Sequence, residues 1–455
     1  MSTSDKYQTL KRMDHTHLWH PFTQMREWMG EDPCIIAEGD GSYLIDVNGN
    51  RYLDGVSSLW CNLFGHRRPE LDQALKAQAD RIAHSTFLGL SHVPGIELAA
   101  RLTAMVPAGL TRVFYSDSGA TAVEVALKLA VQYWQLLGKT ERSRFARLEE
   151  SYHGDTVGAM SVGYSDLFHH YHRDLLFPTL AVKPPYAYQR EQGLSEAEAM
   201  ERSVQEARDT VTREKDRLAA FIMEPVMQGA AGMWPQPAGY VRAIRDVCKD
   251  NGVLFIADEV ATGFGHTGRM WACEHDGVSP DLMCVGKGIT GGYLPLAATF
   301  ATEEIFSAFL GDYGEFKSFF HGHTYTGNPL ACAVALATLD IFEREALMGT
   351  VPLKIASLEE RLRKDILTLA HVRELRRRGF MTGIELVKDK ERGERYDPGV
   401  RIANQVVLEA RRRGVIVRPL GDTLIMLPPL TISDAELETL VNVVRDSIRR
   451  VTEDS

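Results

Sequence analysis

Two apolar runs between residues 254 and 288 constrain the fold more than any other part of the sequence. The first run ends at Asp258, and the second ends in the triplet Gly286-Lys287-Gly288. Each run has the length and the β-branched or aromatic content of a strand that is buried on both faces of a parallel sheet. Such strands open onto a ligand crevice at their carboxyl ends. The sequence therefore predicts an α/β protein in which a carboxylate and a lysine arrive at one rim of the sheet.

The pair of Asp258 and Lys287 matches the chemical needs of pyridoxal phosphate. Desolvation lowers the pKa of an amine, so a lysine between two glycines at a buried strand end can attack a carbonyl carbon. A buried carboxylate suits a protonated ring nitrogen, which this cofactor needs in order to withdraw electrons. The alternative is an aspartate that caps a helix and a lysine that lies in solvent. The two residues together favour the cofactor site.

A turn of small residues is the candidate phosphate site. Ser118, Gly119, Ala120 and Thr121 lie between a strand predicted at 112–115 and a long helical pattern. The first amide groups of a helix have no acceptor within the helix, and the positive end of its dipole attracts anions. A plain helix cap without a ligand accounts for the same pattern.

Two aromatic residues are candidates for the walls of the site. Tyr152 follows a short predicted strand, so its ring could stack on a planar cofactor at the same rim. Trp60 lies beside small residues and could line a pocket, and burial in the core is the equal alternative.

Three other patterns favour structural interpretations. Residues 263–268 match G-x-G-x-x-G, but the segment that follows is too short for the packed helix of a dinucleotide fold. The histidines at 169, 170 and 172 lack the carboxylate or cysteine partners of a metal site, so we expect surface polarity and no metal. The arginines at 376–378 stand among acidic residues and are expected to form a solvated face.

Composition and length limit the class of protein. The chain has 455 residues and a formal charge of −10, which disfavours nucleic acid or an anionic membrane as the main partner. Its start lacks the apolar core of a secretion signal, and its longest apolar run is about half the ~20 residues that a membrane span needs. Its six cysteines lack paired zinc spacing and are expected to be reduced. We therefore expect a cytoplasmic protein.

The length also predicts two domains. We expect an N-terminal segment over residues 1–65 that joins the smaller lobe and covers the site, a large cofactor-binding domain over 66–335, and a small α+β domain over 336–455. The N-terminal segment contains a hairpin pattern around Asn48-Gly49, the strongest local hairpin signal. The last domain is expected from helical patterns near 353–369 and 398–413 and short strand patterns between and after them.

With these residues assembled, the chain resembles the class III pyridoxal-phosphate aminotransferases of fold type I over nearly its whole length. The motifs that carry the resemblance are D-E-V-A-T-G-F-G from Asp258 and G-K-G-I-T-G-G from Gly286. Within that class the chain is most similar to the branch that forms 7,8-diaminononanoate for biotin synthesis. The motifs typical of that branch begin at Leu18, Tyr115, Tyr152, His321 and Arg418.

The resemblance implies a role for each matching residue. Lys287 would carry the cofactor covalently and act as general base, Asp258 would face the ring nitrogen, and Tyr152 would form an aromatic wall. Ser118, Gly119 and Ala120 would bind the phosphate. His323 and Thr324 would complete the cofactor site, with Thr324 reaching the neighbouring subunit of a homodimer. The expected substrate contacts are Phe22, Trp60, Tyr152, Gly322 and Arg418, and the last would meet the distant carboxylate of the keto acceptor, 8-amino-7-oxononanoate.

Four positions depart from the branch that uses S-adenosylmethionine as amino donor. That branch has tryptophan at the position of Leu59, tyrosine at the positions of Phe22 and Ile425, and arginine at the position of His266. A sulfonium that carries adenine is best held by aromatic and cation–π contacts, so these changes keep L-lysine open as the donor. An ω-amino-acid aminotransferase is the alternative function, and a non-catalytic cofactor-binding protein is the third.

Overall fold

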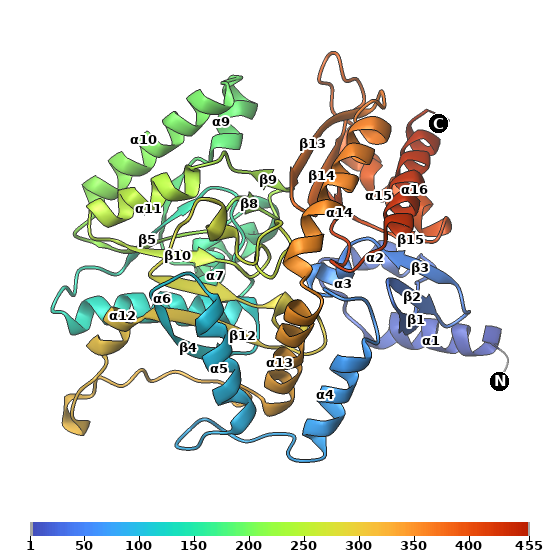
Figure 1. The fold of residues 1–455 in the computed structure, drawn as a ribbon. Helices are drawn as coiled ribbons and strands as arrows, with labels where there is room; N and C mark the ends of the chain where they lie inside the picture. Colours follow the sequence, from blue (N-terminus) through green and yellow to red (C-terminus); the bar gives the residue numbers. More distant parts are fainter. Residues whose placement is uncertain (1–2, 454–455) are drawn as a thin grey trace.

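The computed structural model describes residues 3–453, and its largest sheet has seven strands (Figure 1). The strand order is β4, β12, β11, β10, β7, β5, β6. Four neighbouring pairs are parallel, and only β12 runs antiparallel to its neighbours among these strands. The mainly parallel sheet confirms the predicted fold class. The bounds are β4 Leu110–Ser116, β5 Arg144–Leu148, β6 Leu180–Val182, β7 Leu218–Met223, β10 Leu254–Asp258, β11 Leu282–Val285 and β12 Ala297–Thr302.

The two apolar runs form β10 and β11 at the centre of this sheet, and every residue of both strands is buried. The strands pair in parallel, with Asp258 opposite Cys284. Parallel pairing places both carboxyl ends at one edge, because neighbouring strands then point the same way. Lys287 follows β11 by two residues, so the carboxylate and the lysine arrive together as predicted.

Helices cover both faces of the large sheet (Figure 1). Helix α6 packs on β11, β12 and β4, and its apolar stripe buries nine residues against the sheet. Helices α10 and α11 pack together and reach β6 and β10, while α5 and α13 pack side by side near β4. The bounds are α4 Pro69–Ala79, α5 Val93–Met105, α6 Gly119–Leu136, α7 Val157–Val162, α8 Asp166–His169, α9 Pro185–Gln192, α10 Glu196–Glu214, α11 Tyr240–Asp250, α12 Glu303–Ala308 and α13 Pro329–Arg344.

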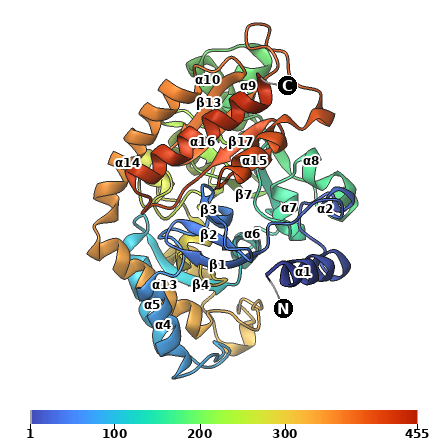
Figure 2. The ribbon, with the colours of Figure 1, turned by 90° about the vertical axis from the view of Figure 1, so that its right-hand side faces the viewer.

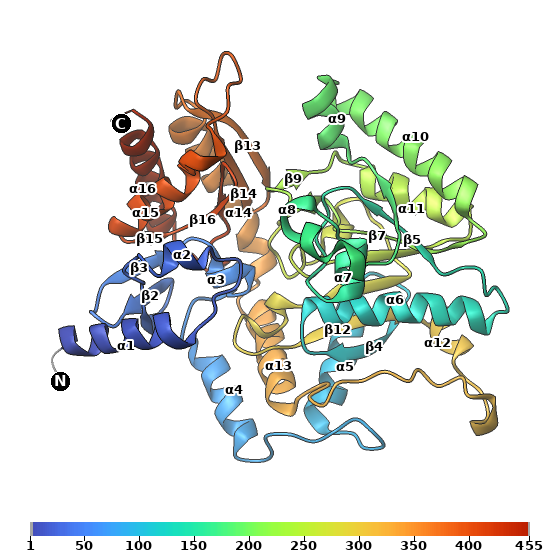
Figure 3. The ribbon, with the colours of Figure 1, turned by 180° about the vertical axis from the view of Figure 1, so that it is seen from behind.

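The two ends of the chain share a smaller sheet (Figure 3). Its strands follow the order β1, β2, β3, β15, and β15 pairs in parallel with β3, so that Val415 faces Leu53. The hairpin predicted around Asn48-Gly49 joins β2 and β3. The bounds are α1 Thr3–His17, α2 Met25–Trp28, β1 Ile36–Asp40, β2 Tyr43–Asp46, β3 Arg51–Asp54, α3 Ser57–Trp60 and β15 Val415–Ile416.

The C-terminal region contains a third sheet with the order β13, β14, β17, β16, covered by α14, α15 and α16 (Figure 2). A two-stranded sheet of β8 and β9 lies beside β13. Residue 335 falls within α13, and the predicted divisions at residues 65 and 335 stay predictions. The bounds are β8 Met227–Gln228, β9 Trp234–Pro235, α14 Leu347–Arg361, β13 Val372–Arg378, β14 Met381–Leu386, α15 Ile402–Arg412, β16 Arg418–Leu420, β17 Thr423–Met426 and α16 Asp434–Thr452.

The expected solvated face at 376–378 is wrong for Arg376. This side chain is 5% exposed, and it donates hydrogen bonds to the Tyr186 hydroxyl at 2.9 Å and to Thr423 Oγ1 at 2.6 Å. Burial of an arginine is tolerated here because polar partners from α9 and β17 surround it. Among residues 3–453, none of the helices combines the length and the apolar composition that a membrane crossing requires. The six cysteines are free thiols.

Candidate active site

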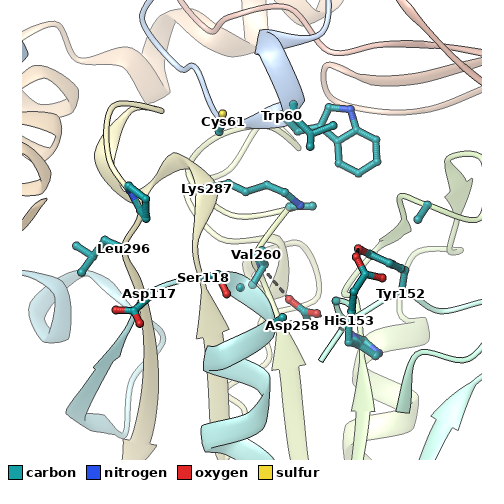
Figure 4. Close-up of a pocket in the computed structure, with 18 of the residues that line it drawn as sticks. Trp60, Cys61, Asp117, Ser118, Tyr152, His153, Asp258, Val260, Lys287 and Leu296 are labelled. Atoms are coloured by element: carbon teal, nitrogen blue, oxygen red, sulfur yellow. Dashed lines mark hydrogen bonds and ion pairs between the residues drawn. The ribbon is translucent and has the colours of Figure 1, made fainter. Parts of the chain in front are cut away.

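A cavity of about 800 Å³ opens at the carboxyl ends of β10 and β11 (Figure 4). Its walls come from α3, from the start of α6, from the loop after β5 and from the loops after β10 and β11. This volume lies in the range of small-molecule sites. The structure brings together at this cavity seven residues that the sequence singled out: Trp60, Ser118, Gly119, Ala120, Tyr152, Asp258 and Lys287.

Lys287 extends across the cavity beneath the Trp60 ring, with Nζ 5.1 Å from the ring centroid (Figure 4). Its backbone has φ of 44°, a left-handed conformation that is uncommon for residues other than glycine. Enclosure lowers the pKa of the Lys287 amine, since desolvation disfavours the charged form, and the negative charge of Asp258 opposes this shift. The neutral amine, which is the nucleophile and the base, is therefore more available than in water.

Asp258 ends β10 and is 4% exposed. His153 Nδ1 donates to its Oδ2 at 2.6 Å, and the Val260 amide donates to its Oδ1 at 3.0 Å. Figure 4 shows this carboxylate at the floor of the cavity, below Lys287. A buried carboxylate held by two donors is fixed in orientation. It can therefore face a positively charged group that enters the cavity.

The start of α6 forms a close-fitting wall of the cavity. Ser118 Oγ accepts from the Thr121 amide at 3.4 Å, and Thr121 Oγ1 accepts from the Ser118 amide at 2.9 Å, which satisfies two donors of the helix start. A Cβ added at Gly119 would lie 2.4 Å from Val260 Cγ1, so only glycine fits here. The amides of Gly119 and Ala120 are the first two of the helix, and such amides lack intrahelical acceptors. This end of an 18-residue helix can hold an anion.

Trp60 is both a buried residue and part of the cavity wall, so it combines the two alternatives that the sequence left open. It is 7% exposed and follows a turn in which Ser57, Ser58 and Trp60 all have positive φ. Asp54 holds that turn, because its carboxylate accepts from the amide and the hydroxyl of Ser58. The strained turn thereby fixes the indole above Lys287.

Tyr152 forms the opposite wall. Its hydroxyl donates to Asp155 Oδ2 at 2.7 Å, and its backbone amide donates to Glu224 Oε2 at 3.2 Å. Burial raises the pKa of Tyr152, and the hydrogen bond to Asp155 adds to this shift, while the positive charge of Arg418 acts against it. The phenol is therefore a hydrogen-bond donor at neutral pH.

Five predicted residues do not line the cavity of the described chain. Phe22 is exposed and packs edge-on against Phe168, with centroids 5.8 Å apart. His323 Nδ1 lies 3.1 Å from Oδ2 of Asp117, which is itself a lining residue. Arg418 lies in β16, close enough for its charge to act on Tyr152. Gly322 and Thr324 lie in the loop before α13, and the space around Gly322 is open.

Sequence reasoning missed three residues at this site. His153 lies in the motif that begins at Tyr152, and nothing in the local sequence indicates that it pairs with Asp258. Glu224 follows β7 at the same rim and lines the cavity, and burial raises the pKa of its carboxyl to about 7. Its position after an apolar strand was the signal that could have found it. His169 was expected at the surface, but it is 1% exposed, because its ring stacks on Tyr152.

Comparison with known proteins identifies the family. The family model described as aminotransferase class III matches residues 25–448. The chain belongs to the class III aminotransferases. A curated relative from Nitratidesulfovibrio vulgaris, named adenosylmethionine-8-amino-7-oxononanoate aminotransferase, is 54% identical over 446 residues, which cover 98% of this chain and 82% of the relative. This class III chain is therefore an aminotransferase.

Solved structures agree with this assignment. The crystal structure of adenosylmethionine-8-amino-7-oxononanoate aminotransferase from Methanocaldococcus jannaschii is 46% identical, has a TM-score of 0.92 and covers 98% of this chain and 99% of its own. An amine transaminase from an uncultivated Pseudomonas species, solved in its PLP-bound form, is 38% identical with a TM-score of 0.91, covering 96% of this chain and 99% of its own. The cofactor of this aminotransferase is pyridoxal phosphate.

The residues present fit that cofactor. The start of α6 offers free amides to a phosphate, and Gly119 lets this helix start pack directly against Val260, where a Cβ would clash. The buried Asp258 offers a carboxylate to a ring nitrogen, and among the described residues the Lys287 amine has no ion-pair partner. The start of α6, the Asp258 carboxylate and the Lys287 amine surround one cavity. A phosphorylated pyridine aldehyde requires these three groups together, for its phosphate, its ring nitrogen and its aldehyde.

Proposed function

We propose that this aminotransferase transfers an amino group to the ketone of 8-amino-7-oxononanoate and so forms 7,8-diaminononanoate in biotin biosynthesis. The observation that carries the proposal is the 54% identity, over 98% of this chain, to a relative named for that acceptor. The cavity supports it with a lysine of lowered pKa and a buried carboxylate at one rim.

Each residue of the cavity would have a separate role in the reaction. Pyridoxal phosphate, when bound, supplies an aldehyde that links to amines and a ring that withdraws electrons. Asp258, oriented by His153, would keep the ring nitrogen protonated. Ser118, Gly119 and Ala120 would hold the phosphate at the start of α6. Lys287 would bind the cofactor covalently and, once released, would move a proton at the reacting carbon, since its lowered pKa leaves a neutral amine.

Substrate recognition is assigned to the wall around Tyr152. Tyr152 and Trp60 would flank the reacting carbon, and Phe22 and Gly322 would complete the entrance. Arg418 would meet the distant carboxylate of the acceptor, because its planar guanidinium suits a carboxylate. Its position near Tyr152 supports this role, since the charge of Arg418 acts on that phenol.

We propose S-adenosylmethionine as the amino donor, since the relatives carry that donor in their name. L-lysine is the second candidate, because the aromatic residues expected for a sulfonium are reduced. Leu59 lines the cavity where that branch has a second tryptophan. Ile425 is fully buried in β17 opposite Arg418 and has no polar group. Burial lowers the pKa of His266 to about 4, so this side chain is uncharged at neutral pH and does not replace the positive charge of an arginine.

We further propose a cytoplasmic homodimer in which His323 and Thr324 act at the subunit boundary. Several large apolar side chains near this region are exposed in the single chain, which supports a covering partner. Examples are Leu88 at 89%, Tyr313 at 95% and Phe320 at 79%.

The experiment that tests the function supplies purified protein and pyridoxal phosphate with one donor at a time. We expect 7,8-diaminononanoate from 8-amino-7-oxononanoate with S-adenosylmethionine, detected by mass spectrometry, and ping-pong kinetics. Formation of 7,8-diaminononanoate with L-lysine and not with S-adenosylmethionine would make L-lysine the donor and leave the proposed acceptor unchanged. Turnover of ω-amino acids with pyruvate, and none of 8-amino-7-oxononanoate, would establish the alternative ω-amino-acid aminotransferase. A protein that binds the cofactor and turns over no pair would be non-catalytic.

A further inference from the structure

His169 is a buried side chain that the proposed mechanism leaves without a role. It ends the short helix α8, and its ring lies nearly parallel to that of Tyr152, with centroids 6.2 Å apart and an interplanar angle of 11°. Its Nδ1 accepts a hydrogen bond from the Ser165 amide at 3.2 Å. A neutral imidazole that accepts at Nδ1 carries its proton on Nε2.

The Nε2 atom of His169 points to Asp155. It is buried, has no close hydrogen bond among the described residues, and lies 3.5 Å from Asp155 Oδ1. This separation is at the outer limit of a hydrogen bond, and contacts of this kind tighten when a substrate closes the site. A buried donor without another acceptor favours that contact, because an unsatisfied buried N–H destabilises the folded protein.

Asp155 links this donor to the cavity. Its second oxygen, Oδ2, accepts from the Tyr152 hydroxyl at 2.7 Å, and both Tyr152 and Asp155 line the cavity. The Asp155 side chain is 50% exposed and lies in a loop, so its own surroundings constrain it weakly. His169 is the one interior anchor that the described contacts provide for it.

We propose that His169 is a positioning residue for the substrate pocket, which orients the Asp155 carboxylate through Nε2–H so that Asp155 fixes the Tyr152 hydroxyl on the cavity wall. The inference rests on the proposed function, because that function makes Tyr152 a wall of the substrate site. It deepens that function by adding a residue that does not touch the substrate.

Removal of the His169 donor should change the pH dependence of the reaction. Asp155 faces Tyr152, His169 and His172, and the contact with His169 is the largest cause that lowers the pKa of this carboxyl. Once protonated, Asp155 no longer accepts from Tyr152 as a carboxylate does. Loss of the His169 donor raises the pKa of Asp155, so the acid limb of kcat/KM for the donor moves to higher pH.

Three variants test the inference in the holoenzyme. His169→Phe keeps an aromatic ring against Tyr152 and removes the donor, His169→Gln returns a donor with similar reach, and His170→Gln is the control at an exposed neighbour. We expect His169→Phe to lower kcat/KM about 10-fold, the scale on which loss of an orienting partner reduces activity. We expect its acid limb to move upward, His169→Gln to recover both properties, and His170→Gln to match the wild type.

A second measurement does not depend on activity. Crystals of His169→Phe without substrates should show the Tyr152 hydroxyl displaced from Asp155, against 2.7 Å in the wild type. If His169→Phe fails to fold, His169→Asn replaces it, because asparagine keeps the acceptor for Ser165 and is too short to reach Asp155. An unchanged pH profile and unchanged geometry would overturn the proposal, as would equal impairment of His169→Phe and His169→Gln.

The test separates this inference from the proposed function. The pH profiles use whichever donor the wild type accepts, and the crystals need none. A wild type that does not aminate 8-amino-7-oxononanoate would overturn the proposed acceptor and leave the His169 test intact.

Discussion

Lys287 occupies a position that no other lysine of the described chain shares, because it is the one lysine on the cavity wall. We expect Lys287→Ala to abolish turnover and the absorbance of the covalently bound cofactor, measured by steady-state kinetics and by spectra of the purified protein. Lys354→Ala is the matched control. Burial also lowers the pKa of Lys354, but its amine donates to the Leu430 carbonyl away from the cavity. Near-normal turnover by Lys287→Ala would show that another group is the nucleophile.

Asp258 supplies a charge that an amide of the same shape cannot supply. We expect Asp258→Asn to bind the cofactor and to lose about 100-fold or more in kcat, the scale of removing one preorganised electrostatic contact. Asp281→Asn is the control, because Asp281 lies before β11 beside Arg245 and does not line the cavity. Equal kcat for wild type and Asp258→Asn would reduce this carboxylate to a structural acceptor for Val260.

Glu224 predicts how stability depends on pH. Burial raises the pKa of this carboxyl from 4.5 to about 7, so the native state binds more protons than the unfolded state between these values. The free energy of unfolding therefore falls as pH rises from about 4.5 to 7, by roughly 3 kcal/mol for this group, and is level above.

Glu224→Gln should remove that share of the pH dependence, since the amide stays neutral. Denaturant unfolding at pH 5 and pH 8 measures the difference, and Glu201→Gln on the exposed face of α10 should leave it unchanged. A variant with the pH dependence of the wild type would mean that Glu224 titrates normally in the folded protein.

At the scale of elements, the start of α6 depends on contact with the loop after β10. We expect Gly119→Ala to weaken pyridoxal-phosphate binding about 10-fold or more, because the added Cβ would lie 2.4 Å from Val260 Cγ1 and displace the helix start. Titration of the cofactor followed by its absorbance measures this. Gly119→Ala with Val260→Ala should recover affinity, and Gly349→Ala, which meets nothing within 4 Å, should have no effect. Unchanged affinity in Gly119→Ala would place the anion elsewhere.

Elements with a strong local pattern could be predicted from the sequence. The runs that became β10 and β11, the helix after Ser118 and the hairpin at Asn48-Gly49 each form where the pattern indicated, because apolar periodicity and turn chemistry act locally. Boundaries were less accurate. The helix expected from residue 353 begins at Leu347, with Pro352 inside it.

Polar residues whose burial depends on distant partners could not be predicted. Arg376 is buried because Tyr186, 190 positions earlier, accepts its hydrogen bond, and His169 is buried because it packs on Tyr152. The same limit applies to the site. Lys287 and Asp258 follow from strand ends, whereas the partnership of His153 with Asp258 spans 105 positions and follows from no local pattern.

At the scale of the whole molecule, mixed dimers test whether the two subunits share their active sites. If Thr324 acts across a dimer, each site takes Lys287 from one subunit and Thr324 from the other. Mixing inactive Lys287→Ala chains with impaired Thr324→Val chains should then create one native site in every mixed dimer, and random pairing yields about one quarter of wild-type activity. Sedimentation should give about twice the 50.8 kDa of one chain. Activity no higher than the mean of the two parents would mean that Thr324 serves its own subunit.

The parallel pairing of β15 with β3 has a consequence for synthesis on the ribosome. Leu53 cannot pair until Val415 is made, about 360 residues later. Synthesis of that stretch takes roughly 20–70 s at typical elongation rates. During that interval β3 has an open edge, and the turn that carries Trp60, just after β3, lacks its support. The hydrogen bond from Leu427 N–H to the Gly55 carbonyl, and that from the Ser57 hydroxyl to the Leu427 carbonyl, form only then. The turn at residues 57–60, which holds Trp60 over the cavity, is therefore fixed late in synthesis. A chain truncated before residue 415 would leave the ribosome without the contacts that hold this turn.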